Sequence, residues 1–346
     1  MDVASSPDRL RSSGGEDLIY LAFTFWTVIG LCLDGWAHLN RPELESFLTP
    51  WHAVFYSGFA LAAAWLATMT MRRRPTAPNL ARAVPDGYLP AAVGLVVFAA
   101  GGVGDAIWHA VFGIEVGLDA LLSPTHLLLL LGLLLGTSGP LRSAWRNPGV
   151  SVDPGSIRAL LPALLSTAAT TATVAFFFLY ANGFNNWAMT RAFDGESGRG
   201  ELEASHGVLA TLATTVILLG PALVLLRRWR PPRGSITLVL GLVGVFLAGL
   251  DAFANWWQVI APLAGGLVFD LIASPGRLRL EPRWTARVAG AASAFTLAAV
   301  AAPTIGLAWG LAWPPELWAG GVGMAALAGF GLAVLIHPPP TPAGAG

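Results

Sequence analysis

Long apolar runs, each bounded by charged residues or proline, recur along the chain. An α-helix needs about 20 apolar residues to cross the hydrocarbon core of a bilayer. Runs of this kind predict ten transmembrane helices, at residues 17–38, 50–71, 87–111, 124–142, 156–183, 204–227, 235–257, 258–274, 284–311 and 316–336. We therefore expect an all-α, polytopic integral membrane helix bundle. Glycine and proline interrupt several runs, which transmembrane helices tolerate when neighbouring helices satisfy the backbone.

Polar residues at the ends of the first four spans form an internal repeat. The first span ends in Asp34-Gly-Trp-Ala-His38, and the second is entered through Glu45-Ser-Phe-Leu-Thr49-Pro50-Trp51-His52. The third span ends in Asp105-Ala-Ile-Trp-His109, and the fourth is entered through Asp119-Ala-Leu-Leu-Ser123-Pro124-Thr125-His126. The shared entry pattern, acidic-x-x-Leu-Ser/Thr-Pro-x-His, predicts tandem helical hairpins that have one orientation.

The repeat weakens along the chain. The fifth span ends in Asn182-Gly-Phe-Asn-Asn186, the sixth begins Ala204-Ser205-His206, and the seventh ends in Asp251-Ala-Phe-Ala-Asn255. We interpret these as degraded copies. The chain then divides into a cytoplasmic N-terminal segment (1–16), two hairpins with the full motifs (17–142), two degraded copies (156–274), a last helix pair (284–336) and a Pro/Gly tail (337–346).

Helix geometry brings the repeated residues together in each pair. Asp and His four residues apart lie one above the other on the same helix face. Across the connecting loop, Thr or Ser is a good N-cap and Pro a good first helical residue, which places His in the first turn of the returning helix. Those two helix ends are neighbours in an antiparallel pair. We therefore expect two clusters, Asp34 with His38 and His52, and Asp105 with His109 and His126.

Both clusters have the composition of metal sites. Two imidazoles and one carboxylate leave coordination positions open, as exchangeable and catalytic sites require, and they suit copper, zinc or iron. Ionisable side chains at membrane depth are energetically costly and usually functional. The alternative is a structural hydrogen-bond network at the membrane interface. Further candidate donors are Asn182, Asn186, His206, Glu45 and Asp119.

The two motifs resemble those of one metal-binding subunit of the copper membrane monooxygenases, the particulate methane and ammonia monooxygenases. The metal-binding helices of that subunit carry Asp-x-x-x-His followed by a Thr-Pro-x-His helix entry, and its second set begins with Asn where this chain has Asp105. The resemblance covers roughly residues 30–130 and implies copper at both clusters. The family's subunit has fewer helices, and a different subunit of those enzymes provides a soluble copper-binding domain of a kind not found in this sequence.

Composition and charge agree with a membrane protein and indicate its orientation. The chain is 55% hydrophobic and 12% charged, whereas soluble domains are about 25% charged. The formal net charge is zero, so no basic excess is present for binding nucleic acid. Every basic residue is an arginine, and all but Arg41, Arg191 and Arg199 fall on one side of the predicted spans. The positive-inside rule makes that side cytoplasmic. Both termini are then cytoplasmic, and the metal clusters lie near the non-cytoplasmic face of the plasma (inner) membrane.

These patterns predict a membrane metal-binding protein, with copper as the leading metal. As an enzyme it would be a copper-dependent monooxygenase component that oxidises a small apolar substrate with oxygen, using electrons from a quinol or a protein donor. The first alternative is a protein that handles or transports copper or zinc without oxygenase activity. The second is a structural or sensory membrane protein. The expected partners are the lipid bilayer, other membrane subunits or an electron donor, and further copies of the chain in an oligomer.

Overall fold

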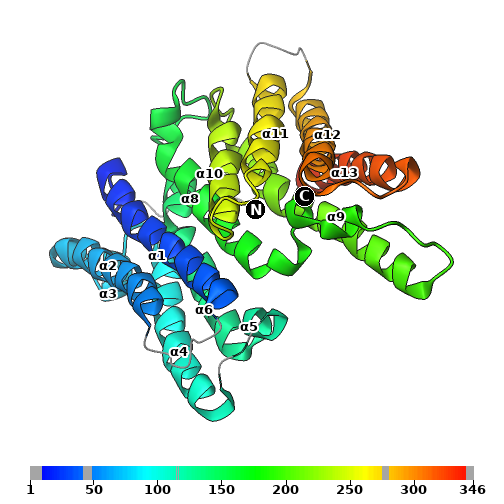
Figure 1. Cartoon of the computed structure of the whole chain (residues 1–346). Helices are drawn as coiled ribbons and strands as arrows, with labels where there is room; N and C mark the ends of the chain where they lie inside the picture. The colour runs from blue at the N-terminus through cyan, green and yellow to red at the C-terminus, as the bar shows by residue number, and fades with distance from the viewer. Residues whose placement is uncertain (1–9, 42–48, 114, 116, 275–279, 340–346) are drawn as a thin grey trace. The chain divides into compact units, whose positions relative to one another are not determined.

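A computed structural model describes residues 10–41, 49–113, 115, 117–274 and 280–339, and the regular structure in these ranges is entirely helical (Figure 1). Within these ranges, eight helical segments are long and apolar enough to cross a membrane. They are formed by α1 (Gly14–Asn40), α2 (Pro50–Arg73), α4 (Leu89–Phe112), α6 with α7 (Pro124–Thr137 and Gly139–Arg146), α8 (Ile157–Phe177), α9 (Gly198–Arg228), α12 (Pro282–Trp309) and α13 (Pro315–Ile336). Large apolar side chains are exposed along them, for example Leu307 and Leu335. The chain is therefore an all-α, multi-pass membrane protein with apolar helices suited to contact with lipid.

Two further apolar helices are shorter than the spans predicted for them. α10 (Ser235–Gly249) has 15 residues and α11 (Trp257–Ala273) has 17. At 1.5 Å per residue, helices of this length fall short of a bilayer core about 30 Å thick. The predicted span 235–257 ends early because Ala252 and Phe253 have φ of 54° and 63°, in the left-handed region that a right-handed helix excludes. Ten complete spans thus remain a prediction.

Short helical segments connect the long ones. They are η1 (Arg74–Thr76), α3 (Leu80–Ala83), α5 (Leu118–Leu122), η2 (Leu179–Ala181), η3 (Gly183–Asn185) and η4 (Trp187–Thr190). The predicted span 156–183 accordingly gives way to 3-10 turns after Phe177. Asn182 and Asn186 therefore lie beside these short turns rather than on a long helix.

The described residues belong to two compact units. The first holds the residues up to Ser151 together with Arg158–Phe178 and Gly249–Phe253. The second holds Val152–Ile157, Leu179–Ala248 and the residues from Ala254 onward. Most of α8 therefore belongs to the first unit, and all of α9 to the second. Both sets of repeated Asp and His residues lie in the first unit.

Close backbone contact between α1 and α2 depends on glycine. A Cβ atom at Gly30 would lie 2.6 Å from Cα of Phe55, and one at Gly58 would lie 2.5 Å from the backbone N of Thr27. Such distances leave no room for a side chain. Small residues let transmembrane helices approach and gain van der Waals contact. α4 and α6 are packed in the same way, since a Cβ at Gly132 would lie 2.7 Å from the backbone N of Phe98.

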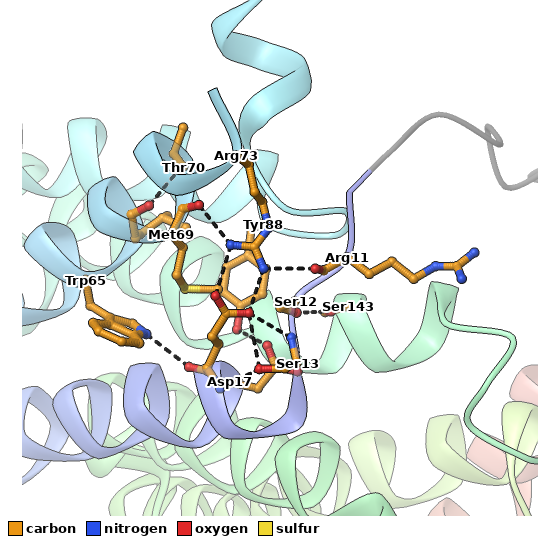
Figure 2. Close-up of polar contacts among 12 residues, drawn as sticks. Arg11, Ser12, Ser13, Asp17, Trp65, Met69, Thr70, Arg73, Tyr88 and Ser143 are labelled. Atoms are coloured by element: carbon orange, nitrogen blue, oxygen red, sulfur yellow. Dashed lines mark hydrogen bonds and ion pairs between the residues drawn. The ribbon is translucent and has the colours of Figure 1, made fainter. Parts of the chain in front are cut away.

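An ion pair ties the start of α1 to the end of α2 (Figure 2). Arg73 donates to both carboxylate oxygens of Glu16, at 3.0 and 2.6 Å, and to the backbone oxygen of Arg11. Glu16 also completes a capping box with Ser13, and Trp65 donates to its backbone oxygen. A bidentate arginine–carboxylate pair is among the stronger charged contacts. It fixes the end of the first hairpin opposite to the one that carries Asp34.

In the second unit, Asp270 of α11 caps α10. Its carboxylate accepts hydrogen bonds from the backbone N–H groups of Ile236 and Thr237 and from the Thr237 hydroxyl, at 3.1, 2.8 and 2.7 Å. The first N–H groups of a helix have no partner within the helix. Asp270 supplies that partner from a different helix, so this buried carboxylate has a structural role.

Candidate metal centres

The first cluster lies where α1 ends and α2 begins. Asp34 and His38 occupy the last turns of α1, four residues apart. Thr49 caps α2 by accepting the backbone N–H of His52 at 3.1 Å, and Pro50 is the first helical residue. This is the arrangement that the entry pattern predicts, and it places His52 on the first turn opposite Asp34.

The three side chains of the first cluster converge. Nε2 of His52 lies 3.4 Å and Nε2 of His38 lies 3.8 Å from Oδ2 of Asp34. One ligand atom from each residue lies within 4.8 Å of the others. The other carboxylate oxygen of Asp34, Oδ1, is buried and has no hydrogen-bond partner among the described residues. A buried, unpaired carboxylate oxygen is unfavourable, and a cation would satisfy it.

The second cluster repeats this construction on α4 and α6. Ser123 caps α6 and accepts the backbone N–H of His126 at 3.4 Å. Nε2 of His126 lies 3.2 Å from Oδ1 of Asp105, and Nε2 of His109 lies 3.4 Å from Oδ2. The ligand atoms again lie within 4.8 Å of one another. Asp105 is only 1% exposed, so the carboxylate is removed from water.

Backbone carbonyls orient both imidazoles of the second cluster. Nδ1 of His109 lies 3.1 Å from the carbonyl oxygen of Gly113, and Nδ1 of His126 contacts the carbonyl oxygen of Ala120. A carbonyl only accepts hydrogen bonds, so each Nδ1 carries a proton. In a neutral imidazole Nε2 then presents a lone pair to Asp105. Two acceptors so close together need a proton or a metal ion between them, and an outer hydrogen bond of this kind is typical of metal-binding histidines.

Two residues near the second cluster were not predicted. Thr125 donates from its hydroxyl to Oδ1 of Asp105 at 2.9 Å. Glu115 accepts a hydrogen bond from Nε1 of Trp108, and its carboxylate lies 3.8 Å from Nδ1 of His109. Thr125 occupies the variable position of the entry pattern. Its hydroxyl was the only sequence feature that could have indicated a hydrogen bond to Asp105. Glu115 follows the end of α4, and its approach to His109 depends on a loop path that the helix periodicity does not specify.

The two clusters are close enough to interact electrostatically. The charge of Asp34 acts on His109, His126 and Asp105 as well as on its own partner His38. A cation bound at one cluster would therefore change the electrostatic environment of the other.

The remaining candidate donors do not form a third cluster in the described part of the chain. Asn182 donates to Oε1 of Gln258 at 2.9 Å, and Asn186 donates to the backbone oxygen of Gly207 at 2.7 Å. His206 and Asp119 are exposed on α9 and α5. Glu45 lies outside the described residues. The asparagines of the degraded copy thus make structural hydrogen bonds.

No protein family, curated protein or solved structure significantly matches the chain. Its function must therefore be inferred from the two clusters and their surroundings. The similarity to the copper membrane monooxygenases remains a prediction based on the two motifs.

Proposed function

We propose that this membrane protein binds two metal ions, one at Asp34, His38 and His52 and one at Asp105, His109 and His126. The observation that carries the proposal is the convergence of two imidazole nitrogens and one carboxylate oxygen within 4.8 Å in each cluster. The acceptor pair His126–Asp105 and the unpaired Oδ1 of Asp34 both fit a bound cation. Each set provides three protein ligands and leaves further coordination positions for exchangeable ligands.

Copper is the metal we propose first. Neutral imidazole with carboxylate suits copper, zinc and iron, and the motif resemblance to the copper membrane monooxygenases favours copper among them. When bound, copper would supply the one-electron chemistry that oxygen activation requires. The chain's own residues would hold it: each Asp would balance positive charge, and the carbonyl-bound histidines would present Nε2. The substrate of such an oxygenase would be small and apolar, reaching the cluster from the bilayer, with a quinol or protein as electron donor.

Metal handling without oxygenase activity is the second candidate function. It is favoured by the openness of the first cluster, where the side chain of His38 is 28% exposed. A partly exposed ligand beside an unpaired carboxylate oxygen suits a site that accepts and releases copper or zinc. Oxygen consumption by the metal-loaded protein separates the two functions, since only the oxygenase consumes oxygen with substrate and reductant present.

Orientation and assembly complete the proposal. We place both termini in the cytoplasm of a cell bounded by a plasma (inner) membrane, and both clusters near its outer face, because arginine gathers on the other side. We also propose that α10 and α11 complete ten spans arranged as tandem hairpins. An oligomer, with or without other membrane subunits, would cover the exposed apolar surface not in contact with lipid.

Metal content tests the proposed function directly. The full chain is purified from membranes, and bound metals are measured for the wild type, H38A/H52A, H109A/H126A and the fourfold variant. We expect each double variant to lose one of two metal equivalents and the fourfold variant to lose both. His206→Ala is the matched control, because this exposed histidine lies outside both clusters. Unchanged metal content in the fourfold variant would overturn the proposal, and electron paramagnetic resonance of the wild type would identify cupric ion.

A further inference from the structure

A small cavity lies inside the first unit, between α1, α2, α4 and α6. Residues of all four helices line it, among them Thr27, Phe59, Phe98 and Leu133. It has room for one small molecule, and its wall is almost wholly apolar. The cavity therefore belongs to the same four helices that carry the two metal clusters.

The few polar side chains around the cavity are bonded to the backbone. The hydroxyls of Thr24 and Thr27 each donate to a backbone oxygen earlier in α1, at 3.0 Å. Those of Tyr20 and Thr137 donate to backbone oxygens of α6, at 3.2 and 2.8 Å. A buried water needs two to four polar partners, and a cavity without them stays dry and takes apolar guests. This cavity is suited to an apolar molecule rather than to water.

The cavity has the same position relative to both clusters. On each of the four helices, one residue of its wall lies seven positions from a residue of a cluster. The pairs are Thr27 and Asp34 on α1, Phe59 and His52 on α2, Phe98 and Asp105 on α4, and Leu133 and His126 on α6. Seven positions are two helical turns, which return to the same helix face and advance about 10 Å along the axis. The cavity thus lies two turns from both clusters, on the helix faces that carry the ligands.

Contacts between aromatic rings connect the cavity wall to the clusters. The ring centroid of Phe98 lies 5.8 Å from that of Tyr56, and the centroid of Tyr56 lies 6.1 Å from that of His52. A Cβ atom at Gly102 would lie 3.0 Å from the hydroxyl oxygen of Tyr56, so this side chain reaches from α2 across to α4. Gly102 is three residues before Asp105. An apolar molecule in the cavity is therefore separated from both clusters by aromatic rings.

We propose that this cavity binds one molecule of dioxygen and holds it two helical turns from both metal clusters. Dioxygen is small and apolar, so it dissolves better in the hydrocarbon core of a bilayer than in water and reaches the cavity from the lipid. Binding forms and breaks no covalent bond, and no electron changes hands in the cavity. The use of the bound dioxygen rests on the proposed oxygenase function, whereas the binding itself requires no metal.

Gly136 provides the test, because it lines the cavity. Outside its own helix, a Cβ atom added there would have only the hydroxyl oxygen of Tyr20 within 4 Å, at 3.7 Å, so Gly136→Ala fills the cavity without a clash. Crystals of the full chain without added metal are pressurised with xenon, an apolar probe that is located by its anomalous scattering. We expect a xenon peak in the wild-type cavity and its loss in G136A. Gly104→Ala is the matched control and should keep the peak, because its Cβ would make an ordinary contact with Thr125 at 3.4 Å, away from the cavity.

Dioxygen is then tested in the same crystals in place of xenon. We expect elongated density at the xenon position in the wild type and G104A, and none in G136A. The proposal is overturned by a wild-type cavity that takes up xenon but no dioxygen, or neither gas, by an equal xenon peak in G136A, or by an ordered water in the cavity of untreated crystals. Thermal unfolding of G136A no earlier than the wild type shows that the variant has folded. Because no metal is added, failure here is distinguishable from failure of the proposed metal binding, which metal content decides.

Discussion

Nε2 of His126 lies 3.2 Å from Oδ1 of Asp105, although Nδ1 of the same ring faces a carbonyl oxygen. With Nδ1 protonated, a neutral ring directs a lone pair at the carboxylate, whereas a protonated ring donates to it from Nε2. The Thr125 hydroxyl binds the same oxygen of Asp105. A proton or a metal ion between Nε2 and Oδ1 would therefore stabilise this pair. This relationship makes the second cluster the better organised of the two.

Thr125→Val should weaken metal binding at the second cluster. Valine keeps the shape of threonine but cannot donate to Asp105, so the carboxylate loses the contact that orients it. Loss of an outer hydrogen bond at a metal site typically lowers affinity by about 10- to 100-fold. When metal-free protein is titrated with metal, one equivalent should bind with this lower affinity and the other with unchanged affinity. Equal affinities in T125V and wild type would mean that the hydroxyl does not orient the carboxylate.

Glu115→Gln should also weaken the second cluster, for a different reason. The variant removes a negative charge 3.8 Å from Nδ1 of His109 and keeps the side chain's size. A less polarised imidazole is a poorer ligand for a cation. Asp119→Asn is the matched control, because this exposed acid on α5 makes the same charge change away from the histidine. Isothermal titration with copper should give a lower affinity for E115Q than for D119N. An equal loss of affinity in both variants would indicate only a long-range charge effect.

The parts of the structure that could be predicted are those fixed by local chemistry. Thr49 and Ser123 cap their helices because the side-chain oxygen and the N–H group it accepts are close in sequence, so the entry pattern alone locates His52 and His126. The early end of α10 depends on left-handed conformations at Ala252 and Phe253, which favour glycine and carry no sequence signal in these residues.

Long-range packing decides the features that the sequence pattern missed. Asn182 has the motif position of a metal ligand, but its side-chain amide donates a hydrogen bond to Gln258, far along the chain. Asp270 of α11 accepts hydrogen bonds from two backbone N–H groups at the start of α10, more than 30 residues earlier in the sequence. Both outcomes depend on which helices become neighbours, and one sequence does not specify that.

Asp270→Ala should destabilise the second unit without removing metal. The variant leaves the first N–H groups of α10 unsatisfied in a buried setting, and loss of a helix cap costs about 0.5–2 kcal/mol. Asp270→Asn retains one accepting oxygen and should cost less than alanine. Thermal unfolding in detergent measures the stabilities of the three proteins, which should decrease from wild type to D270N to D270A. A lower metal content in well-folded D270A would contradict the purely structural role of this carboxylate.

Gly30→Ala should damage the first cluster and spare the second. The added Cβ would lie 2.6 Å from Cα of Phe55, so α1 and α2 must move apart, and overpacking of this kind costs about 1–3 kcal/mol. Gly30 is one turn before Asp34, and His52 is on the displaced helix, so their separation of 3.4 Å should widen. We expect a lower midpoint of thermal unfolding and loss of one metal equivalent. Gly323→Ala is the control, since no atom lies within 4 Å of its added Cβ. A G30A protein that unfolds earlier but keeps both metals would show that the first cluster does not depend on the close approach of its two helices.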